Sequence, residues 1–370
     1  MSKKRLLIAY HSAEYGGIEV QILDIIKELS SEIDIYVACP NGPLVEEYLK
    51  YGAVEHLEIF PTKEIDFEYI NKIREVINRE SIQIVHGHEL KTGVQVIYAA
   101  FREKVPKRIY HVHTPFIFWK YGSAKRYFAL VANFIANFIT GNLLATDVLA
   151  LTPYIKNVRS KYELILQSKI KVIPNAVRPI PQITPEQKTQ IKGQYKLDAD
   201  KAVIGYVARF TPEKGQEVLL KAFRDNDKLM DTAQLILVGG GTDLEKLQKE
   251  YSFPNVTFTG RVSELDKEAL LNVFDIFAFP TYAEGFGITL IEALSVGLPA
   301  IVSDLPVLHD VGDDEVQYFK KGDSVELGIK LLDMIENFHE IQSSRQPRID
   351  IAMKYSTERF RDNYRELYLG

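Results

Sequence analysis

Short apolar segments with strand character alternate with amphipathic helical patterns along most of this chain. Strands and helices that alternate in this way form a parallel, doubly wound sheet with helices on both faces. The alternation stops once, between residues 173 and 181, because three prolines in that stretch disfavour both a helix and a central strand. It then begins again. The sequence therefore predicts two Rossmann-like α/β domains with a boundary near residue 178.

The same pattern locates the individual elements. We expect an N-terminal domain over residues 1–178, a C-terminal domain over residues 179–355, and a last helix over residues 356–370 that packs back on the N-terminal domain. The expected strands are Leu6–Ala9, Ile33–Ala38, Ile82–His86, Arg108–Val112, Val148–Leu151, Ala202–Val207, Leu235–Val238, Val256–Phe258, Ile276–Phe279 and Ala300–Val302. The expected helices are Val20–Leu29, Phe67–Asn78, Val94–Phe101, Ala124–Ile139, Glu217–Phe223, Leu244–Lys249, Leu265–Asn272, Ile288–Val296 and Thr357–Leu369.

The composition limits which cellular compartment and which cofactors we expect for this chain. The single cysteine, Cys39, excludes an intrachain disulfide and a cysteine-based metal cluster. The N-terminal apolar run is too short for a signal peptide, and no uncharged run reaches the length of a membrane-spanning helix. We therefore expect a cytoplasmic protein with no bound metal and no other cofactor.

Positive charge is concentrated in one stretch, although the net charge of the chain is −5. Between Lys91 and Arg126 the single acid is Glu103, and aromatic residues are interleaved with the basic ones. This mixture suits an anionic membrane surface or a lipid-linked phosphate, and it equally suits a solvated basic face above a buried helix. We expect no nucleic-acid partner. The basic residues are Lys91, Arg102, Lys104, Lys107, Arg108, Lys120, Lys125 and Arg126, and the aromatic residues are Phe116, Phe118, Trp119, Tyr121, Tyr127 and Phe128.

A glycine turn between two acids is the most informative local motif. Residues 284–288 read Glu-Gly-Phe-Gly-Ile, and a second acid, Glu292, completes a Glu-x7-Glu spacing with Glu284. A glycine-relieved turn that opens a helix presents unpaired N–H groups and the positive end of the helix dipole to an anion. Carboxylates on either side accept hydrogen bonds from hydroxyl groups. The motif therefore predicts a phosphate site flanked by hydroxyl-binding acids, as a nucleotide sugar requires.

Other loops are expected at the carboxyl ends of strands, where ligands bind in open α/β sheets. The loop from Arg209 to Gly215 supplies two cations, Arg209 and Lys214, that can stabilise negative charge on a leaving phosphate. The paired glycines Gly16 and Gly17 precede a helix and form a second expected anion site. Further candidates at strand ends are His113, the glycine turn that begins at Gly239, and Arg261 with Val262, which could hold a base through backbone groups or form a plain turn.

This ordered set resembles the retaining glycosyltransferases of the GT-B fold, of the large family 4 type. The resemblance is carried by Glu284 and Glu292, by the Arg209 to Gly215 loop, by the hinge Ile173-Pro174-Asn175 and by Gly16-Gly17, and it covers nearly the whole chain. It implies two Rossmann-like domains that face a central cleft, with an acceptor-binding N-terminal domain and a C-terminal domain that binds the nucleotide sugar.

The resemblance also implies an activity. A sugar, most simply a hexose, moves from a nucleoside diphosphate donor to a hydroxyl acceptor with retention at the anomeric carbon and no required metal. Glu292 is implied to bind the ribose hydroxyls, and Glu284 the transferred sugar together with the amides near Phe286, Gly287 and Ile288. His113 is implied to lie near the donor sugar and the acceptor. The expected acceptor is a lipid-linked or surface glycan, in polysaccharide or lipopolysaccharide synthesis at the inner membrane face.

Several alternatives remain open from the sequence. Glu284 could act as a covalent nucleophile, although we favour the leaving phosphate as the group that takes the acceptor proton. The same fold could carry a nucleotide-sugar epimerase or a non-catalytic nucleotide-sugar-binding protein. His113 could be a structural strand-end histidine, His111 is expected to be structural, and His86 and His88 are undecided. The acidic turns at residues 198–200 and 225–227 have metal-binding spacing but are expected to serve the local backbone.

Overall fold

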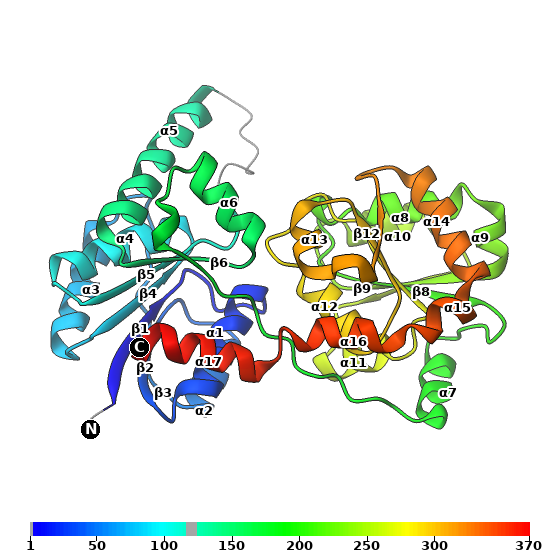
Figure 1. Cartoon of the computed structure of the whole chain (residues 1–370), viewed down its shortest axis with the longest axis horizontal. Coiled ribbons are helices and arrows are strands. Elements are labelled where there is room, and N and C mark those ends of the chain that lie inside the picture. Colours follow the sequence, from blue (N-terminus) through cyan, green and yellow to red (C-terminus); the bar gives the residue numbers. More distant parts are fainter. Residues whose placement is uncertain (1–2, 116–123) are drawn as a thin grey trace. The chain divides into compact units, whose positions relative to one another are not determined.

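The computed structural model describes residues 3–115 and 124–370, and the side chains of residues 124–128 lie outside that description. Within it the chain forms two compact units, which are described separately. The first comprises Met1–Ala176 and Thr357–Gly370, and the second comprises Val177–Ser356. Figure 1 shows both units and labels their elements. The chain thus leaves the first unit at Ala176 and returns to it at Thr357 with its last helix.

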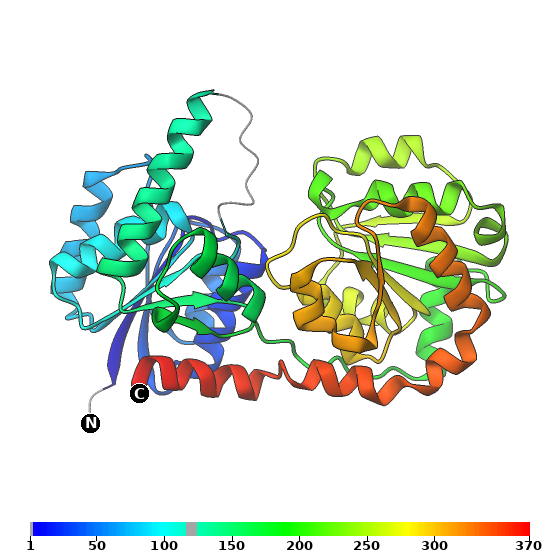
Figure 2. The same cartoon turned by 45° about the horizontal axis from the view of Figure 1, so that its top comes forward.

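The first unit is built on a seven-stranded parallel sheet in the order β3-β2-β1-β4-β5-β6-β7. Its helices cover both faces, as Figure 2 shows. The strands are β1 (Lys4–Ala9), β2 (Ile33–Ala38), β3 (Ala53–Leu57), β4 (Ile84–His88), β5 (Lys107–His111), β6 (Asp147–Ala150) and β7 (Ile170–Val172). The helices are α1 (Gly17–Leu29), α2 (Leu44–Lys50), α3 (Phe67–Arg79), α4 (Leu90–Arg102), α5 (Ala124–Ile139), α6 (Pro153–Tyr162) and α17 (Thr357–Leu369).

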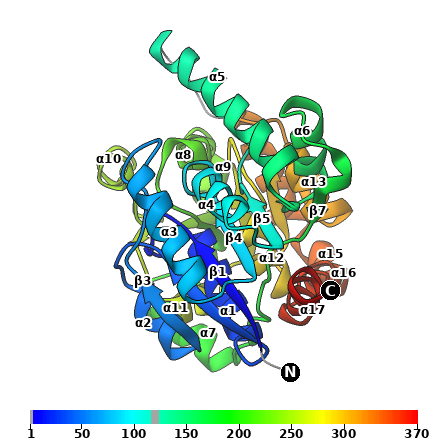
Figure 3. The ribbon, with the colours of Figure 1, turned by 90° about the vertical axis from the view of Figure 1, so that its left-hand side faces the viewer.

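The last helix, α17, completes the core of the first unit. It lies against α1, and its apolar residues Phe360, Tyr364, Leu367 and Tyr368 are at most 2% exposed. They join a cluster formed by one face of β1 and β2 and by the buried stripes of α1 and α2. The N-terminal end of α5 extends away from the sheet, as Figure 3 shows. No helix among the described residues combines the length and the apolar character needed to cross a membrane.

The second unit repeats the scheme with a six-stranded parallel sheet in the order β10-β9-β8-β11-β12-β13. Its core lies between the sheet and the apolar faces of α8, α10 and α14. The strands are β8 (Ala202–Val207), β9 (Ala233–Val238), β10 (Val256–Gly260), β11 (Ile276–Phe279), β12 (Ala300–Ser303) and β13 (Gln317–Phe319). The helices are α7 (Pro185–Gln194), α8 (Gln216–Arg224), α9 (Asp227–Thr232), α10 (Leu244–Glu250), α11 (Glu264–Leu271), α12 (Ile288–Ser295), α13 (Pro306–Gly312), α14 (Ser324–Glu336), α15 (Phe338–Ser343) and α16 (Arg345–Met353).

Two Rossmann-like sheets confirm the predicted fold class, and most expected elements lie within a few residues of their observed bounds. One shift matters for function. The strand expected at Ile82–His86 is observed at Ile84–His88, because a turn with positive φ at Ser81 delays its start. This shift puts His88 at the carboxyl end of β4 and Glu89 immediately beyond it. The edge strands β3, β7 and β13 were not expected, since each is short and weakly patterned.

Candidate functional site

The candidate site residues fall into two groups, one in each unit. Each group lies on loops at or near the carboxyl ends of parallel strands, where an α/β sheet binds ligands. In the second unit the loops follow β8, β9, β10 and β11, and they carry Arg209, Lys214, Gly239, Arg261, Val262, Glu284, Phe286, Gly287, Ile288 and, on the helix that follows, Glu292. In the first unit the group comprises Gly16, Gly17, His113 and Asn175.

The loop after β8 is held in place by a glycine. Gly215 has φ of 69°, and a Cβ built on it would lie 1.8 Å from the carbonyl oxygen of Pro280. Only glycine fits such a close approach. The buried side chain of Gln216 donates a hydrogen bond to the carbonyl of Arg209 at 2.6 Å, and the hydroxyl of Tyr206 donates to the carbonyl of Lys214 at 3.3 Å. The backbone that carries both predicted cations is therefore fixed at its two ends.

Lys214 and Glu284 meet in an ion pair. The Lys214 Nζ donates to Glu284 Oε1 at 2.5 Å, and the side chains are only 17% and 10% exposed. Their loops are also joined through the backbone, because the carbonyl of Glu213 accepts hydrogen bonds from the Tyr282 amide at 2.7 Å and the Thr281 hydroxyl at 3.1 Å. The predicted phosphate cation and the predicted sugar-binding acid are thus in contact, on two loops that are hydrogen-bonded to each other.

The Lys214–Glu284 pair lies at the topological switch point of the second sheet. Strands β8 and β11 are neighbours, and the strand order runs outward from them in opposite directions. Loops that follow such a pair separate and leave a crevice, which is where ligands bind in this architecture. Arg209 lies on the first of these loops, with an exposed side chain. Glu284 lies on the second. The two loops therefore carry a cation and an acid at the switch point, where this architecture binds ligands.

The Glu284 loop ends at a helix start with unpaired amides. Gly287 is the N-cap residue of α12 with φ of 94°, and Ile288 is the first helical residue. The ring of Phe286 is only 3% exposed and packs edge-on against Tyr355 at 5.2 Å. Phe286 therefore contributes its backbone to the site while its ring anchors the loop. The Leu290 amide already donates to the Gly287 carbonyl at 3.0 Å, whereas the amides of Ile288 and Thr289 precede the helical hydrogen bonds and remain suited to an anion.

Glu292 lies one and a half turns into α12 and is paired with a lysine. Lys267, from α11, donates to Glu292 Oε1 at 2.8 Å and to Glu264 at 2.6 Å. Oε2 of Glu292 is buried and has no hydrogen-bond partner among the described residues. Burial raises the pKa of this carboxyl, and Lys267 opposes the shift. A buried acceptor without a partner suits a ligand hydroxyl, because leaving it unpaired is costly.

The glycine turn after β9 joins its two neighbouring loops. Gly239 has φ of 138°, and a Cβ there would lie 1.9 Å from the carbonyl oxygen of Ala208. Its amide donates to the Gly260 carbonyl at 3.0 Å. This geometry matches the expected tight turn that keeps side chains away from a ligand. Arg261 and Val262 follow at the end of β10, with Arg261 exposed and Val262 half-buried.

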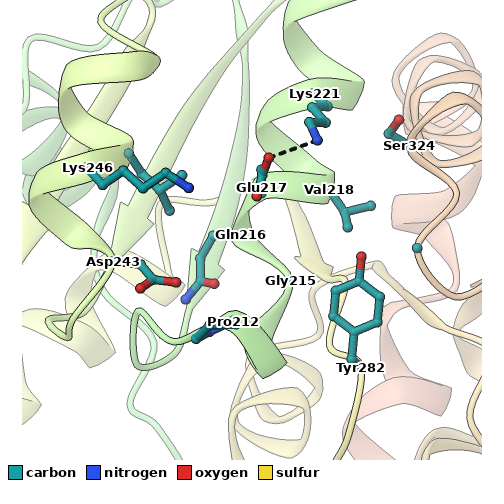
Figure 4. A pocket seen from close by; sticks show the side chains of 12 residues that line it. Pro212, Gly215, Gln216, Glu217, Val218, Lys221, Asp243, Lys246, Tyr282 and Ser324 are labelled. Carbon is teal, nitrogen blue, oxygen red and sulfur yellow. Dashed lines mark ion pairs between the residues drawn. The ribbon is translucent and has the colours of Figure 1, made fainter.

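A pocket of about 280 Å³ lies behind the Arg209 to Gly215 loop (Figure 4). Its walls come from the first two turns of α8, from the start of α10 and from Tyr282, and they include Lys221, which pairs with Glu217 at 2.8 Å. None of Arg209, Lys214, Glu284 and Glu292 lines it. The pocket is therefore separate from the predicted phosphate and hydroxyl groups, although Gly215 borders both.

In the first unit the Gly16-Gly17 turn opens α1, as expected, but it already holds a carboxylate. Glu19, in the first turn, is 6% exposed, and its Oε2 lies 2.5 Å from where a Cβ on Gly16 would be. Ser12 donates to the other oxygen of Glu19 at 2.6 Å. A phosphate at this helix start would have to displace the Glu19 carboxylate or bind beside it. The sequence did not single out Glu19.

His113 is buried in a stack of four imidazoles. Its ring lies 3.9 Å from that of His111, and its Nε2 is 3.1 Å from Nδ1 of His88. His86 continues the stack and contacts the hydroxyl of Tyr368 through Nδ1 at 2.8 Å. Burial, the neighbouring His88 and Arg159 lower the pKa of His113 well below its usual value. The ring is therefore neutral, which is the form expected to hold a hydroxyl.

Three of these histidines lie close enough to raise the question of a metal. The ligand atoms of His86, His88 and His111 are within 4.8 Å of one another and buried. His86, however, is stacked on both of the others, at 4.2 Å and 29° for His88 and at 5.5 Å and 10° for His111, while His88 and His111 are tilted by 40° at 5.3 Å. An imidazole binds a metal in its ring plane, and near-parallel planes do not converge on one point. The arrangement as it stands suits packed neutral rings, and metal-independent chemistry stays a prediction.

The remaining candidates make contacts within their own units. Asn175 is 6% exposed and accepts a short hydrogen bond from the side chain of Gln21 in α1, so the hinge is anchored to the first unit. In the acidic turns, Asp225 pairs with Arg224 at 2.6 Å and Asp198 accepts the amide of Asp200 at 3.0 Å. Both turns lie outside the strand-end loops. The Asp198 contact fits the expected role in the local backbone, whereas the Asp225 contact is a side-chain ion pair.

The basic aromatic stretch is described only in part. Its residues Phe116, Phe118, Trp119, Lys120 and Tyr121, and the side chains of Lys125, Arg126, Tyr127 and Phe128, lie outside the described part of the chain. Of the rest, Lys107 pairs with Asp147 at 3.5 Å, and Arg108 donates to the carbonyl of Leu144 at 2.6 Å. These two cations stabilise their own unit. Membrane binding by the stretch stays a prediction of the sequence.

Comparison with known proteins covers both units. The family model Glycosyltransferase Family 4 matches residues 15–179, and the family model Glycosyl transferases group 1 matches residues 187–344. The chain is 26% identical over 322 residues to the capsular polysaccharide biosynthesis glycosyltransferase CapM of Staphylococcus aureus, which covers 82% of this chain and 81% of CapM. It is also 26% identical over 320 residues to the alpha-monoglucosyldiacylglycerol synthase of Acholeplasma laidlawii, covering 81% of this chain and 77% of the synthase.

Solved structures agree on the fold. HepE of Anabaena, crystallised in complex with UDP-glucose, superposes with a TM-score of 0.83 at 18% sequence identity over 98% of both chains. WaaG, a glycosyltransferase involved in lipopolysaccharide biosynthesis, superposes with a TM-score of 0.76 at 15% identity. The two family models together span most of the sequence, and the relatives agree with the two Rossmann-like units described above. The chain is therefore a glycosyltransferase of the family 4 type with the GT-B fold.

Proposed function

We propose that the protein transfers a sugar, most simply a hexose, from a nucleoside diphosphate sugar to a hydroxyl of a glycan or glycolipid, with retention at the anomeric carbon and without a metal. The observation that carries this proposal is the Lys214–Glu284 pair at 2.5 Å, at the switch point and on the same loop as Arg209. Lys214, the proposed cation for the departing phosphate, is thus in contact with Glu284, the proposed acid for the transferred sugar. The names of the capsular and glycolipid relatives support the acceptor class.

The proposed chemistry breaks the bond between the anomeric carbon and the diphosphate oxygen. Negative charge grows on that oxygen, and the groups proposed to stabilise it are Arg209, Lys214 and the amides of Ile288 and Thr289. In the absence of donor, Lys214 is neutralised by Glu284. When the diphosphate binds, it competes for Lys214 and leaves Glu284 to accept hydrogen bonds from the sugar. Glu292, with its unpaired Oε2, is the proposed ligand of the ribose hydroxyls.

The same proposal assigns the acceptor proton. The diphosphate that leaves takes the proton from the attacking hydroxyl on the same face, so the acceptor oxygen bonds to the anomeric carbon as the phosphate departs. Glu284 as a covalent nucleophile is the competing route. We favour the orienting role, in which Glu284, once the diphosphate has drawn Lys214 away, accepts hydrogen bonds from the sugar. The neutral ring of His113 is the proposed contact of the first unit with the sugar or the acceptor.

The test combines ligand binding with transfer. A thermal-shift panel of nucleoside diphosphates and their sugars should identify the donor, since a ligand at a hundred times its dissociation constant stabilises the folded state by about 2.7 kcal/mol. With that donor, Arg209→Ala and Lys214→Ala should each lower transfer by about 10²–10³-fold. Glu284→Gln should abolish transfer while the protein stays folded.

Lys221→Ala is the matched control. Lys221 is a lysine of the neighbouring helix α8, half-exposed and paired with Glu217. Its removal should leave transfer within twofold of the wild type. Wild-type turnover in the Glu284→Gln or Lys214→Ala protein, or equal losses in Lys221→Ala, contradicts the site assignment. Retention is read separately from the anomeric configuration of the product by NMR.

A further inference from the structure

Glu89 has a backbone conformation that glutamate rarely adopts. It is the first residue after β4 and the N-cap of α4, with φ of 61° and ψ of 166°. Glycine reaches this region readily, whereas a residue with a Cβ is strained there and persists only when its surroundings hold it. Two backbone hydrogen bonds of 2.8 Å do so, from the Glu89 amide to the His111 carbonyl and from the Gly93 amide to the Glu89 carbonyl. Strain of this kind is retained at functional sites more often than elsewhere.

The strained backbone directs the carboxyl group toward His113. The Oε1 atom of Glu89 accepts a hydrogen bond from the His113 amide at 3.2 Å. Within the described part of the chain Oε2 has no hydrogen-bond partner, and the side chain is half-buried. Glu89 therefore fixes the residue that the family resemblance places near the substrate, and it keeps one acceptor oxygen free.

The position of Glu89 repeats that of Glu284. In the first sheet β1 and β4 are the neighbours from which the strand order runs in opposite directions, as β8 and β11 are in the second. The loop after β1 carries Gly16 and Gly17, and Glu89 follows β4 directly. Each unit thus has a glycine-containing loop on one side of its switch point and a glutamate on the other. The rule that ligands bind at the switch point applies equally to both sheets.

The charge state of Glu89 also differs from that of an ordinary surface acid. Burial raises its pKa to about 7, the His113 amide and Arg159 of α6 oppose the shift, and Glu19 of α1 adds to it. Arg159 is itself fully buried against Glu163 of its own helix. A carboxyl in such a setting changes its charge near neutral pH. Perturbed groups of this kind mark functional sites in clefts.

We propose that Glu89 is a substrate-binding residue whose Oε2 accepts a hydrogen bond from a hydroxyl of the sugar acceptor beside His113. The inference rests on the proposed transferase function and extends it to the acceptor. Glu284 and Glu89 then bind different substrates. The first binds the sugar that moves, and the second binds the polyhydroxylated molecule that receives it.

The decisive variant is Glu89→Gln. The amide has the same shape and its oxygen can still accept the His113 N–H, but it cannot ionise. We expect KM for the acceptor to rise by about 10- to 100-fold, the loss of one hydrogen bond to a charged group. The KM for the donor and the thermal shift with the donor should not change. The pH profile of kcat/KM for the acceptor should lose its inflection near pH 7.

Glu89→Gly separates function from structure. Glycine relieves the strained φ, so a residue kept for its substrate contact should give a variant that melts at the same or a higher temperature yet uses the acceptor poorly. Ser81→Gly is the control, since Ser81 also has positive φ, of 49°, in an exposed turn before β4. It should match the wild type in acceptor KM.

Each outcome decides the proposal. An unchanged acceptor KM in Glu89→Gln, or an equal rise in donor and acceptor KM, overturns it. A melting temperature of Glu89→Gly below that of the wild type overturns it as well, because the side chain is then structural. If the wild type neither binds a nucleotide sugar nor transfers sugar, the proposed function fails, and the melting of Glu89→Gly still decides whether the side chain is structural.

Discussion

At the scale of single residues, glycines allow the backbone conformations that position the charged groups of the second unit. Gly215 and Gly260 have nearly the same φ, 69° and 70°. A Cβ on Gly215 would meet the Pro280 carbonyl at 1.8 Å, and a Cβ on Gly260 would meet nothing within 4 Å. The first glycine is required by both backbone conformation and close packing. The second is required by conformation alone.

This pair yields a stability prediction. Gly260→Ala should cost about 1–2 kcal/mol of unfolding free energy, the penalty of left-handed backbone for a residue with a Cβ. Gly215→Ala should cost clearly more, because the β8 loop must also move away from Pro280, and it should weaken donor binding by displacing Lys214. Urea denaturation of both variants is the measurement. Equal losses would show that the approach to Pro280 is not tight in solution.

At the scale of elements, α17 illustrates how distant sequence completes a core. Its buried residues close the face of the sheet that carries the histidine stack, and the Tyr368 hydroxyl lies 2.8 Å from His86 Nδ1. The helical spacing of its apolar residues predicted that α17 docks, and the N-terminal domain was the expected partner. The structure shows that α17 packs on the face formed by β1 and α1.

Removing one buried ring of α17 should therefore destabilise the first unit. Phe360 is 2% exposed, and Phe360→Ala should cost about 3–5 kcal/mol, as for other aromatic side chains removed from a core. Arg361→Ala, its neighbour on the exposed face, should change the free energy of unfolding by less than about 0.5 kcal/mol. Hydrogen exchange resolved by peptide should place the loss in residues 3–115. A loss spread evenly over residues 177–356 contradicts it.

At the scale of the whole molecule, the two units differ in their titrating groups. The buried stack of His86, His88, His111 and His113 belongs to the first unit, whereas the histidines of the second, His309 and His339, are exposed. Burial lowers the pKa of His88 to about 3, and burial together with neighbouring histidines lowers the pKa values of the other three. In the unfolded chain the pKa of each histidine returns to its ordinary value near 6.5. Below that pH the unfolded chain therefore binds more protons than the folded one.

Acid should consequently destabilise the first unit selectively. The free energy of unfolding is not reduced by these histidines above pH 7. It falls as the pH drops below about 6.5, by about 2 kcal/mol per buried histidine at pH 5. Glu89 acts in the opposite direction, since its raised pKa favours the folded state as it protonates, but four histidines outweigh one acid. Proteolysis at graded urea between pH 5 and 8, with fragments assigned by mass, should show residues 3–115 becoming sensitive first. Equal sensitivity of both units contradicts the expectation.

Much of this architecture was readable from local patterns. The strand and helix periodicity predicted the two parallel sheets, and β2, β8 and β11 lie at the expected residues, because buried parallel strands are continuous apolar runs. The glycine turn at Glu284 was predicted from residue types alone. Glu89 and Glu19 were not, since nothing near either acid marks it as more than a polar residue at a strand end or helix start. The edge strands β3, β7 and β13 were not predicted either.

The sequence by itself determined which segments form strands and helices, and which loops carry glycines, cations and acids, because those properties depend on neighbours along the chain. Only the tertiary structure decided that Lys214 meets Glu284, that Lys267 meets Glu292 and that the carboxyl group of Glu89 accepts the amide of His113. Those contacts join residues far apart in sequence. They depend on strand order and register, which bring loop ends together at a switch point and which local periodicity does not encode.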